Sequence, residues 1–191
     1  LGGEQSCRIV VHAGTPKDRH ILRFQVYETS DEYIQSIKDL SDAIGKLPDT
    51  KLIVMFRPSA EIKFKDLVNL VPTNGSTIFT DSAPLDVVLG FTDLLVSYSS
   101  TVIEEALANN VPVLQYGANG RYKHINVDSM GDHENQGINM SPIHHIKNAN
   151  DLRKYLKTLL EQQETTPPIK SRFNPYIFRA DEICSISELL P

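Results

Sequence analysis

The sequence predicts an α/β domain with three layers and a mainly parallel sheet. Two features lead to this prediction. Five or six short apolar runs alternate along the chain with segments of helical periodicity, which is the pattern of parallel α/β proteins. In addition, residues 93–116 place an apolar run, a polar turn, a short helical pattern and a second apolar run in immediate succession. Two strands connected in this way are expected to lie parallel, with a right-handed crossover.

The first half of the chain contains three of the predicted strands. The apolar run at 8–13 leads into Gly14, which ends it. Thr29 to Glu32 has the residues of a helix N-terminus, and apolar side chains recur behind it at intervals of three and four up to Leu47. The predicted order is strand 8–13, helix 30–47, strand 51–56, helix 62–70, strand 77–80 and helix 85–90.

The second half is built around the unit at 93–116. Beyond it, residues 121–140 are polar and rich in Asp, Asn, Gly and His, so a long irregular segment is expected there. The predicted elements of this half are strand 94–96, helix 102–109, strand 111–114, an amphipathic helix at 148–163, a linker at 165–168 and a last helix at 180–189.

Polar side chains cluster where strand 94–96 ends. Ser99, Ser100 and Thr101 come before the helix, and Thr101 with Glu104 three residues later has the signature of a capping box. In an open parallel sheet, ligands bind at the edge formed by the carboxyl ends of the strands. A helix N-terminus and three hydroxyl groups at this edge favour an anionic ligand such as a phosphate.

Two acids, Glu104 and Glu105, stand one turn into the same helix. A carboxylate at this place can accept two hydrogen bonds from the diol of a ribose. The alternative is structural, with Glu104 closing the capping box and Glu105 as a solvated acid of the first turn. From the residues alone, both interpretations remain open.

Two further residues are predicted at the same edge of the sheet. Gly14 follows the first strand and would let a ligand approach the backbone closely. Arg57 follows strand 51–56 directly, and its planar guanidinium can bind a phosphate through two donors. The alternative for Arg57 is an ion pair with an acidic loop residue that only orders the end of the strand.

Composition and charge argue against several classes of function. The formal net charge of −5 gives no electrostatic reason for nucleic-acid binding. No apolar run approaches the roughly 20 residues that would span a bilayer. The histidines and acids at 121–140 lack the spacing of a metal site, so neither a metal nor a cofactor is expected. Cys7 and Cys184 lie far apart, and we expect two free thiols in a reducing cytoplasm.

The central stretch resembles a known family. Ser99 with Glu105 six residues later, the run Glu104-Glu105-Ala106 and the run Val111-Pro112-Val113-Leu114 look like the nucleotide-sugar site in the C-terminal, donor-binding domain of GT-B glycosyltransferases. The general likeness is to the transferases of bacterial capsule and surface-polysaccharide biosynthesis. The stretch also resembles the UDP-N-acetylglucosamine 2-epimerases, which share that fold. A pair of glycines that usually follows the epimerase serine is replaced here by Ser100-Thr101.

The resemblance implies a Rossmann-like domain, one half of a GT-B fold, that binds a nucleotide sugar. In those families the serine and the second acid contact the phosphate and the ribose of the donor. By the same resemblance, Lys17 and Arg19 face the donor's phosphates, Arg57 matches a basic residue often followed by proline, and Ser82 borders the base. A basic surface loop and ordinary turn chemistry are the alternatives for Lys17, Arg19 and Ser82. No catalytic residue is assigned, and the predicted donor-binding residues are Gly14, Lys17, Arg19, Arg57, Ser82, Ser99, Ser100, Thr101, Glu104 and Glu105.

The resemblance covers about residues 7–190. Residues 1–6 are expected to be a linker or a cut end, and residues 7–191 a single domain. Since a GT-B enzyme needs a second domain for its acceptor, we expect a fragment of a glycosyltransferase that is incomplete without an N-terminal domain.

The expected partners are a nucleotide sugar and that missing domain, with no nucleic acid and no membrane span; peripheral attachment at the inner membrane stays open. Two other functions also stay open. One is a UDP-sugar 2-epimerase-like enzyme, and the other is a non-catalytic nucleotide-sugar or protein-interaction module.

Overall fold

Six strands form one sheet in the computed structural model, which describes residues 7–16, 28–59, 61–72, 74–128, 130 and 141–165. The strand order is β3-β2-β1-β4-β5-β6, and every pair of neighbours is parallel. This order is that of the Rossmann fold, in which the direction of winding reverses between β1 and β4. The strands are β1 (Arg8–Gly14), β2 (Thr50–Phe56), β3 (Thr77–Thr80), β4 (Leu94–Ser97), β5 (Val113–Gln115) and β6 (Ile143–His145).

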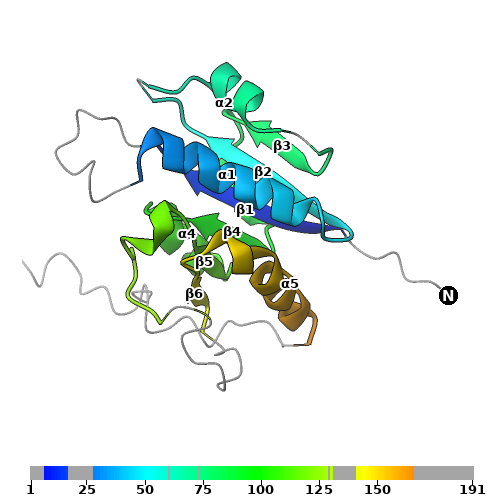
Figure 1. The fold of residues 1–191 in the computed structure, drawn as a ribbon. Helices are drawn as coiled ribbons and strands as arrows, with labels where there is room; N and C mark the ends of the chain where they lie inside the picture. Colours follow the sequence, from blue (N-terminus) through cyan, green and yellow to red (C-terminus); the bar gives the residue numbers. More distant parts are fainter. Residues whose placement is uncertain are drawn as a thin grey trace, which may run out of the picture.

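Helices cover both faces of the sheet (Figure 1). The core on one face contains buried residues of α1 (Ser30–Ile44), α2 (Phe64–Leu70) and α5 (Ala149–Thr165). The core on the other face contains buried residues of α3 (Leu85–Leu89) and α4 (Val102–Ala108). The predicted α/β, Rossmann-like three-layer fold with a parallel sheet is therefore confirmed.

Strand β1 lies at the centre of the sheet, and its side chains alternate between the two cores. Val10 packs in the core of α1, while Val11 and Ala13 pack in the core of α4. His12 shares the face of Val10, because successive side chains of a strand point to opposite sides. A histidine is thereby placed in an otherwise apolar layer, under the first turn of α1.

The first turn of α1 is fixed by a capping box. Thr29 Oγ1 accepts a hydrogen bond from the N–H group of Glu32 at 3.2 Å, and Glu32 Oε2 accepts one from the N–H group of Thr29 at 2.9 Å. These two bonds satisfy backbone donors that the helix itself leaves free. The predicted start of this helix is confirmed, and its carboxyl end lies at Ile44.

The capping box predicted from Thr101 and Glu104 is wrong. Thr101 has helical backbone angles (φ −61°, ψ −12°), and its side chain caps no N–H group. Helix α4 begins at Val102, whose N–H group donates to Ser100 Oγ at 3.4 Å. Glu104 pairs instead with His124 Nε2 at 2.7 Å, because the loop after β5 offers it a side-chain partner.

The sequence prediction also missed β6. No strand was predicted at 143–145, yet these residues form the edge strand of the sheet, with His144 and His145 both buried. Strand β5 runs from Val113 to Gln115, slightly later than predicted, and Thr165 belongs to α5. The predicted helix 180–189 lies outside the described residues.

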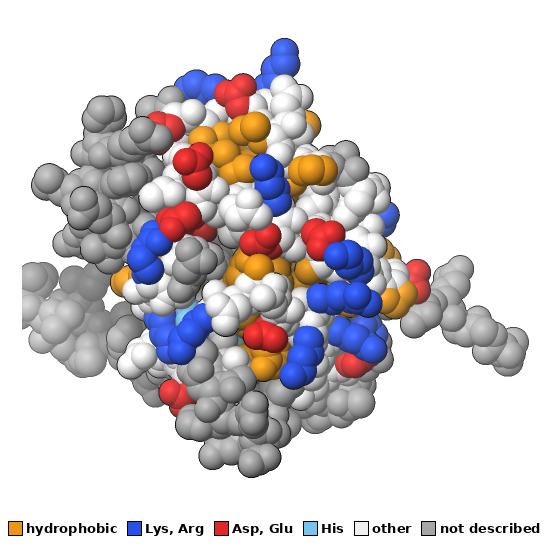
Figure 2. Space-filling view, viewed as in Figure 1, with side chains coloured by type: hydrophobic (Ala, Val, Ile, Leu, Met, Phe, Trp, Pro, Cys, Tyr) orange, Lys and Arg blue, Asp and Glu red, His pale blue; other side chains and the backbone are white. Residues whose placement is uncertain are grey.

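The surface over α1 and α5 carries charges of both signs, with Lys and Arg side chains interspersed among Asp and Glu (Figure 2). In the ranges that the structure describes, no helix is both long and apolar enough to cross a membrane. The same ranges contain no group of three His, Cys, Asp or Glu residues arranged to hold a metal ion.

Candidate functional site at the carboxyl edge of the sheet

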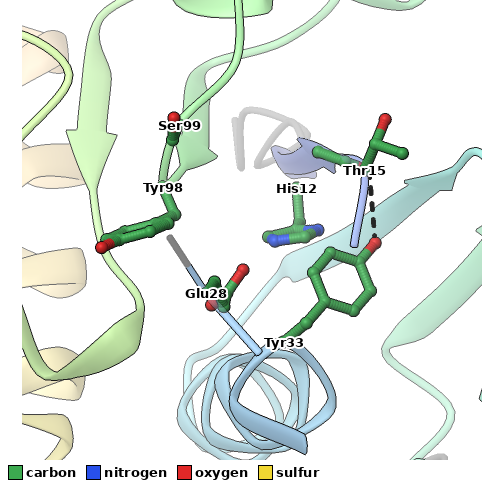
Figure 3. A pocket seen from close by; sticks show the side chains of 7 residues that line it. His12, Thr15, Glu28, Tyr33, Tyr98 and Ser99 are labelled. Carbon is green, nitrogen blue, oxygen red and sulfur yellow. Dashed lines mark hydrogen bonds between the residues drawn. The ribbon is translucent and has the colours of Figure 1, made fainter. Parts of the chain in front are cut away.

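A hollow lies at the carboxyl edge of the sheet, where β1 and β4 meet (Figure 3). This is the topological switch point, the place at which open α/β sheets bind ligands. The hollow has a volume of about 250 Å³, counting space that is open to solvent. Its lining residues come from β1, from the start of α1 and from the loop after β4, and they are His12, Gly14, Thr15, Glu28, Tyr33, Tyr98 and Ser99.

The end of β1 is held in place by hydrogen bonds to its carbonyl groups. Ser97 Oγ donates to the carbonyl of Ala13 at 2.7 Å, and Tyr33 Oη donates to the carbonyl of Gly14 at 3.4 Å. A Cβ atom on Gly14 would meet nothing closer than 3.8 Å, which is ordinary contact. Local packing therefore does not require glycine at this position, and the missing side chain leaves the hollow open.

His12 forms the floor of the hollow. It is 2% exposed, and its ring packs edge-on against Tyr33 with 5.5 Å between the ring centroids. Its Nδ1 atom is buried and has no hydrogen-bond partner among the described residues. Burial lowers the pKa of His12 to about 4, so the imidazole is neutral at pH 7.

Glu28 is the second buried polar side chain of the hollow, at 5% exposure. Ser36 Oγ donates to its Oε1 atom at 3.1 Å, and the backbone of Ala118 forms another hydrogen bond to it. The pKa of Glu28 is raised to about 8, mainly by burial and in part by the nearby charge of Glu32, which together outweigh the hydrogen bonds from Ser36 and Ala118. At pH 7 the carboxyl group is therefore protonated and uncharged.

Gly117 allows the loop after β5 to come this close to Glu28. Its φ of +145° lies in the region that favours glycine, and a Cβ atom there would lie 2.5 Å from Glu28 Oε1 and 3.0 Å from Tyr98 Cβ. The short 3₁₀ helix η1 (Ala118–Gly120) follows directly. Glycine at this position therefore lets the loop pack against Glu28 and Tyr98, two of the lining residues, without displacing Glu28.

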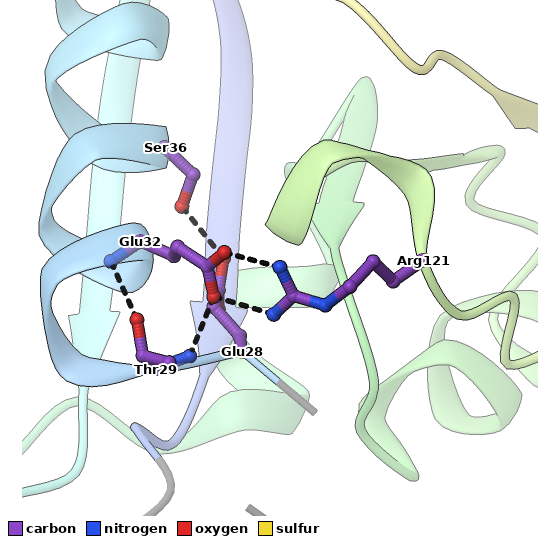
Figure 4. A network of polar contacts seen from close by, with 5 residues as sticks. All are labelled: Glu28, Thr29, Glu32, Ser36 and Arg121. Atoms are coloured by element: carbon purple, nitrogen blue, oxygen red, sulfur yellow. Dashed lines mark hydrogen bonds and ion pairs between the residues drawn. The ribbon is translucent and has the colours of Figure 1, made fainter. Parts of the chain in front are cut away.

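Arg121 ties the same loop to α1 (Figure 4). Its two terminal nitrogens bind both carboxylate oxygens of Glu32, with 2.6 Å between Nη2 and Oε2. The bond to Arg121 is the main reason why the pKa of Glu32 falls to about 2, and the pKa of Arg121 rises in return. The two charges compensate each other, so this pair brings no net charge to the hollow.

Two of the predicted donor-binding residues, Gly14 and Ser99, line the hollow. Arg57 stands near them at the same edge. Phe56 pairs with Gly14, and His12 pairs with Val96, so Arg57, Thr15 and Ser99 continue the three strands at one level. Neighbouring strands lie about 4.8 Å apart, which places the backbones of Arg57 and Ser99 roughly 10 Å from each other.

The side chain of Arg57 is exposed, and it forms no hydrogen bond or ion pair within the described part of the chain. No described acidic residue therefore pairs with Arg57, and the alternative of an ion pair with an acidic loop residue is untested for the rest of the chain. Ser100 and Thr101 lie in the loop after β4, outside the lining of the hollow. Ser82 is exposed two residues beyond β3, and its N–H group donates to Thr80 Oγ1 at 3.4 Å, as in an ordinary turn.

The two acids of α4 lie outside the hollow. Glu104 binds His124, and Glu105 is exposed on the helix, with no partner for its carboxylate among the described residues. Helix α4 packs on the face of the sheet opposite α1, whereas His12, Glu28 and Tyr33 are on the α1 side. Lys17 and Arg19 lie outside the described residues, so their predicted roles stay predictions.

Sequence reasoning missed five of the seven residues that line the hollow, namely His12, Thr15, Glu28, Tyr33 and Tyr98. One signal was visible for His12, since a single histidine interrupts the apolar run at 8–13 just before Gly14. Glu28 and Tyr98 gave no such signal. Their burial depends on Gly117, which is distant from both in sequence.

Comparison with known proteins identifies the fold. No protein-family model matches the chain, and no curated protein matches it. Solved structures do. A UDP-N-acetylglucosamine 2-epimerase (putative) from Listeria monocytogenes superimposes with a TM-score of 0.58 at 16% identity, over 90% of this chain and 41% of that one. The chain has the fold of one half of a GT-B protein.

Further structures support this conclusion. The UDP-GlcNAc 2-epimerase from Neisseria meningitidis bound to UDP-GlcNAc gives a TM-score of 0.53 at 13% identity, covering 89% of this chain and 41% of that chain. The glycosyltransferase VinC in complex with dTDP gives a TM-score of 0.52 at 14% identity, covering 95% of this chain and 39% of that chain. The chain thus spans about two fifths of the length of these proteins. At such identities the likeness is one of fold, and the predicted resemblance is confirmed at that level.

Proposed function

We propose that this chain is the nucleotide-sugar donor-binding domain of a glycosyltransferase of surface-polysaccharide biosynthesis, and that it acts together with an N-terminal acceptor domain. One observation carries the proposal. Gly14 and Ser99, predicted independently from two distant parts of the sequence, line one hollow at the switch point of a Rossmann-type sheet. Arg57 follows the adjacent strand at the same level, and its guanidinium has no partner within the described ranges of the chain.

In glycosyl transfer the bond between the sugar and the nucleotide phosphate breaks, and negative charge develops on the departing phosphate. Donors fixed in advance around that charge stabilise the transition state. Arg57 supplies a positive fork of N–H groups, and Ser99, Ser100 and Thr101 supply hydroxyl donors in the loop after β4. Because α4 has only seven residues, the proposal relies on these side chains and not on the helix dipole.

No metal is needed in this scheme if Arg57 and the hydroxyl groups neutralise the phosphate. The general base that activates the acceptor would belong to the N-terminal domain, so no catalytic residue is assigned to this chain. We also place the chain in the cytoplasm. Cys7 is a free and exposed thiol, and such thiols persist in reducing compartments.

Calorimetric titration with UDP, GDP and CMP sugars tests the proposal. At least one of these donors should bind the chain, and Arg57→Ala should weaken its binding by about 1.5–3 kcal/mol, the value of a hydrogen bond to a charged group. Lys51→Ala is a matched control. Lys51 lies near the start of β2, about 20 Å from Arg57 at 3.3 Å per residue, so its loss should leave the affinity unchanged. Equal affinity of wild type and Arg57→Ala would remove Arg57 from the site.

A second candidate function is a UDP-sugar 2-epimerase-like enzyme, because UDP-N-acetylglucosamine 2-epimerases share this fold. Analysis of the products formed from UDP-N-acetylglucosamine by the protein with its N-terminal domain separates the two. Release of UDP with transfer of the sugar supports the transferase, and an epimerised sugar supports the alternative.

The third candidate is a non-catalytic module. It would be favoured if none of the nucleotide sugars binds. A Glu105→Ala variant adds a second criterion, since a donor-binding Glu105 should contribute to affinity through the ribose diol. Its exposed position on α4 makes this residue the least supported of the predicted contacts.

A further inference from the structure

Two polar side chains are buried in the hollow, and neither is explained by the scheme above. His12 is 2% exposed and Glu28 is 5% exposed, yet both line the cavity. Buried polar atoms in folded proteins nearly always have a hydrogen-bond partner. The unpartnered Nδ1 atom of His12 therefore indicates that a ligand atom completes the site.

The described residues that line the hollow bring polar groups but no net charge. His12 is neutral because burial lowers its pKa to about 4, and Glu28 is neutral because burial raises its pKa to about 8. The nearest described charges, Glu32 and Arg121, bind each other. The remaining polar groups are hydroxyls, from Thr15, Tyr33, Tyr98 and Ser99.

Such an environment suits a hydroxyl group better than a phosphate. Among the described residues, a phosphate in the hollow would find no uncompensated positive charge and would face the carboxyl group of Glu28. A hydroxyl group donates and accepts hydrogen bonds, as do a neutral imidazole and a protonated carboxyl group. Only about 10 Å³ of the hollow can hold the centre of a water molecule, which is space for about one water-sized group. The hollow therefore has room for only part of a nucleotide sugar.

We propose that this hollow binds an uncharged hydroxyl group of the donor's sugar, with His12 and Glu28 as its hydrogen-bond partners. The phosphates then lie outside it, toward Arg57. The inference rests on the proposed function and deepens it, since it divides the ligand between two parts of the carboxyl edge. His12 points from β1 into the space between Glu28 and Tyr33 (Figure 3), which is where the hydroxyl group would lie.

The test measures the contribution of the sugar separately from that of the nucleotide. Affinities are measured for UDP and UDP-N-acetylglucosamine, GDP and GDP-mannose, and CMP and CMP-N-acetylneuraminate, at pH 7. The ratio of the two dissociation constants in a pair is the sugar increment. We expect one pair to bind with an increment of at least about fivefold, the value of one or more net hydrogen bonds.

His12→Phe keeps a ring in the floor of the hollow but removes both nitrogens. It should lower the sugar increment by about five- to tenfold and leave the affinity for the nucleotide alone within about twofold of wild type. Glu28→Gln keeps an uncharged polar group and should retain the increment, whereas Glu28→Leu should lose it. His144→Gln is the matched control, because His144 is also buried and neutral but lies in β6, away from the hollow.

Thermal unfolding of each variant checks that it folds. If His12→Phe does not fold, the comparison of Glu28→Leu with Glu28→Gln provides the test instead. An unchanged increment in a folded His12→Phe or Glu28→Leu variant would overturn the inference. The inference would also be overturned if these variants lost equal affinity for the nucleotide and for the nucleotide sugar. That result would leave the proposed function standing. If the wild-type chain binds none of the six compounds, the proposed function fails together with the inference. Failure of the inference alone is recognised by wild-type binding that the variants do not change selectively.

Discussion

The protonated state of Glu28 can be tested through stability, without any ligand. Replacing Glu28 by Gln removes the titrating proton and keeps an uncharged side chain of nearly the same size. In the folded chain the pKa of Glu28 is raised to about 8 from a usual value of 4.5. Between these two pH values the folded state holds one proton that the unfolded state releases.

The sign of the effect follows from proton linkage. Stability falls with rising pH wherever the folded state binds more protons than the unfolded state. The contribution of Glu28 is therefore complete below about pH 4.5 and is lost as the pH rises through about 8. Each pH unit inside this window is worth at most about 1.4 kcal/mol, so from pH 5.5 to pH 7.5 wild type should lose about 2 to 3 kcal/mol more than Glu28→Gln.

Urea unfolding at pH 5.5, 6.5 and 7.5 measures this difference for both proteins, provided that both unfold in two states. The comparison uses the change with pH and not the absolute stability. The Glu28→Gln variant could lose the bond from Ala118, but this loss would shift all three values equally, and the other titrating groups are common to both proteins. Parallel pH profiles would refute the reasoning, because they would mean that Glu28 is ionised at neutral pH.

Two further predictions concern the wall of the hollow. Gly117→Ala places a Cβ atom 2.5 Å from Glu28 Oε1 at a φ of +145° and should lower the free energy of unfolding by at least about 2 kcal/mol. The control is Gly75→Ala, at a φ of +75° with open space around it, which should lower the free energy of unfolding by only about 1 kcal/mol. Equal losses in urea unfolding would show that Gly117 is needed for its backbone angle alone. Arg121→Ala should destabilise the chain by about 1 kcal/mol at pH 7, a value kept small because Arg121 is 38% exposed. This contribution should be lost as the pH falls from about 4.5 through about 2, since the bond lowers the pKa of Glu32; an equal effect of Arg121→Ala at pH 7 and pH 2 would contradict it.

The outcome of two similar sequence patterns shows how far local reasoning reaches. Thr29 with Glu32 predicts a capping box, and the structure contains it. Thr101 with Glu104 has the same spacing, but Glu104 binds His124. A capping box involves only neighbouring residues, so the pattern predicts it well until a partner from elsewhere in the fold competes for the carboxylate. The residues near Glu104 in the sequence do not predict such a partner.

The edge strand β6 shows a second limit. Three residues with two adjacent histidines carry no periodicity that distinguishes a strand from a loop. They form a strand because β5 offers its free edge, and Val113 pairs with Ile143. Long-range pairing therefore overrides local preference, as is usual for short strands.

The candidate site also has one part that the sequence predicts and another that only the fold reveals. The sequence located Gly14, Arg57 and Ser99 because each follows an apolar run, and in a parallel sheet such positions share one edge. It could not locate the hollow itself. Ala13 and Ser97 are 84 residues apart in the chain and 2.7 Å apart in the fold, between the Ser97 hydroxyl and the Ala13 carbonyl. Only the strand order brings them together.

By itself, the sequence determined the class of fold and the edge at which polar residues gather, because apolar periodicity and strand ends are local properties of the chain. The tertiary structure decided which loops become neighbours and how deeply each polar side chain is buried. His12 and Glu28 owe their neutral state to that burial. Desolvation depends on everything packed around a group, so the chemical character of the hollow emerges only when the chain is folded.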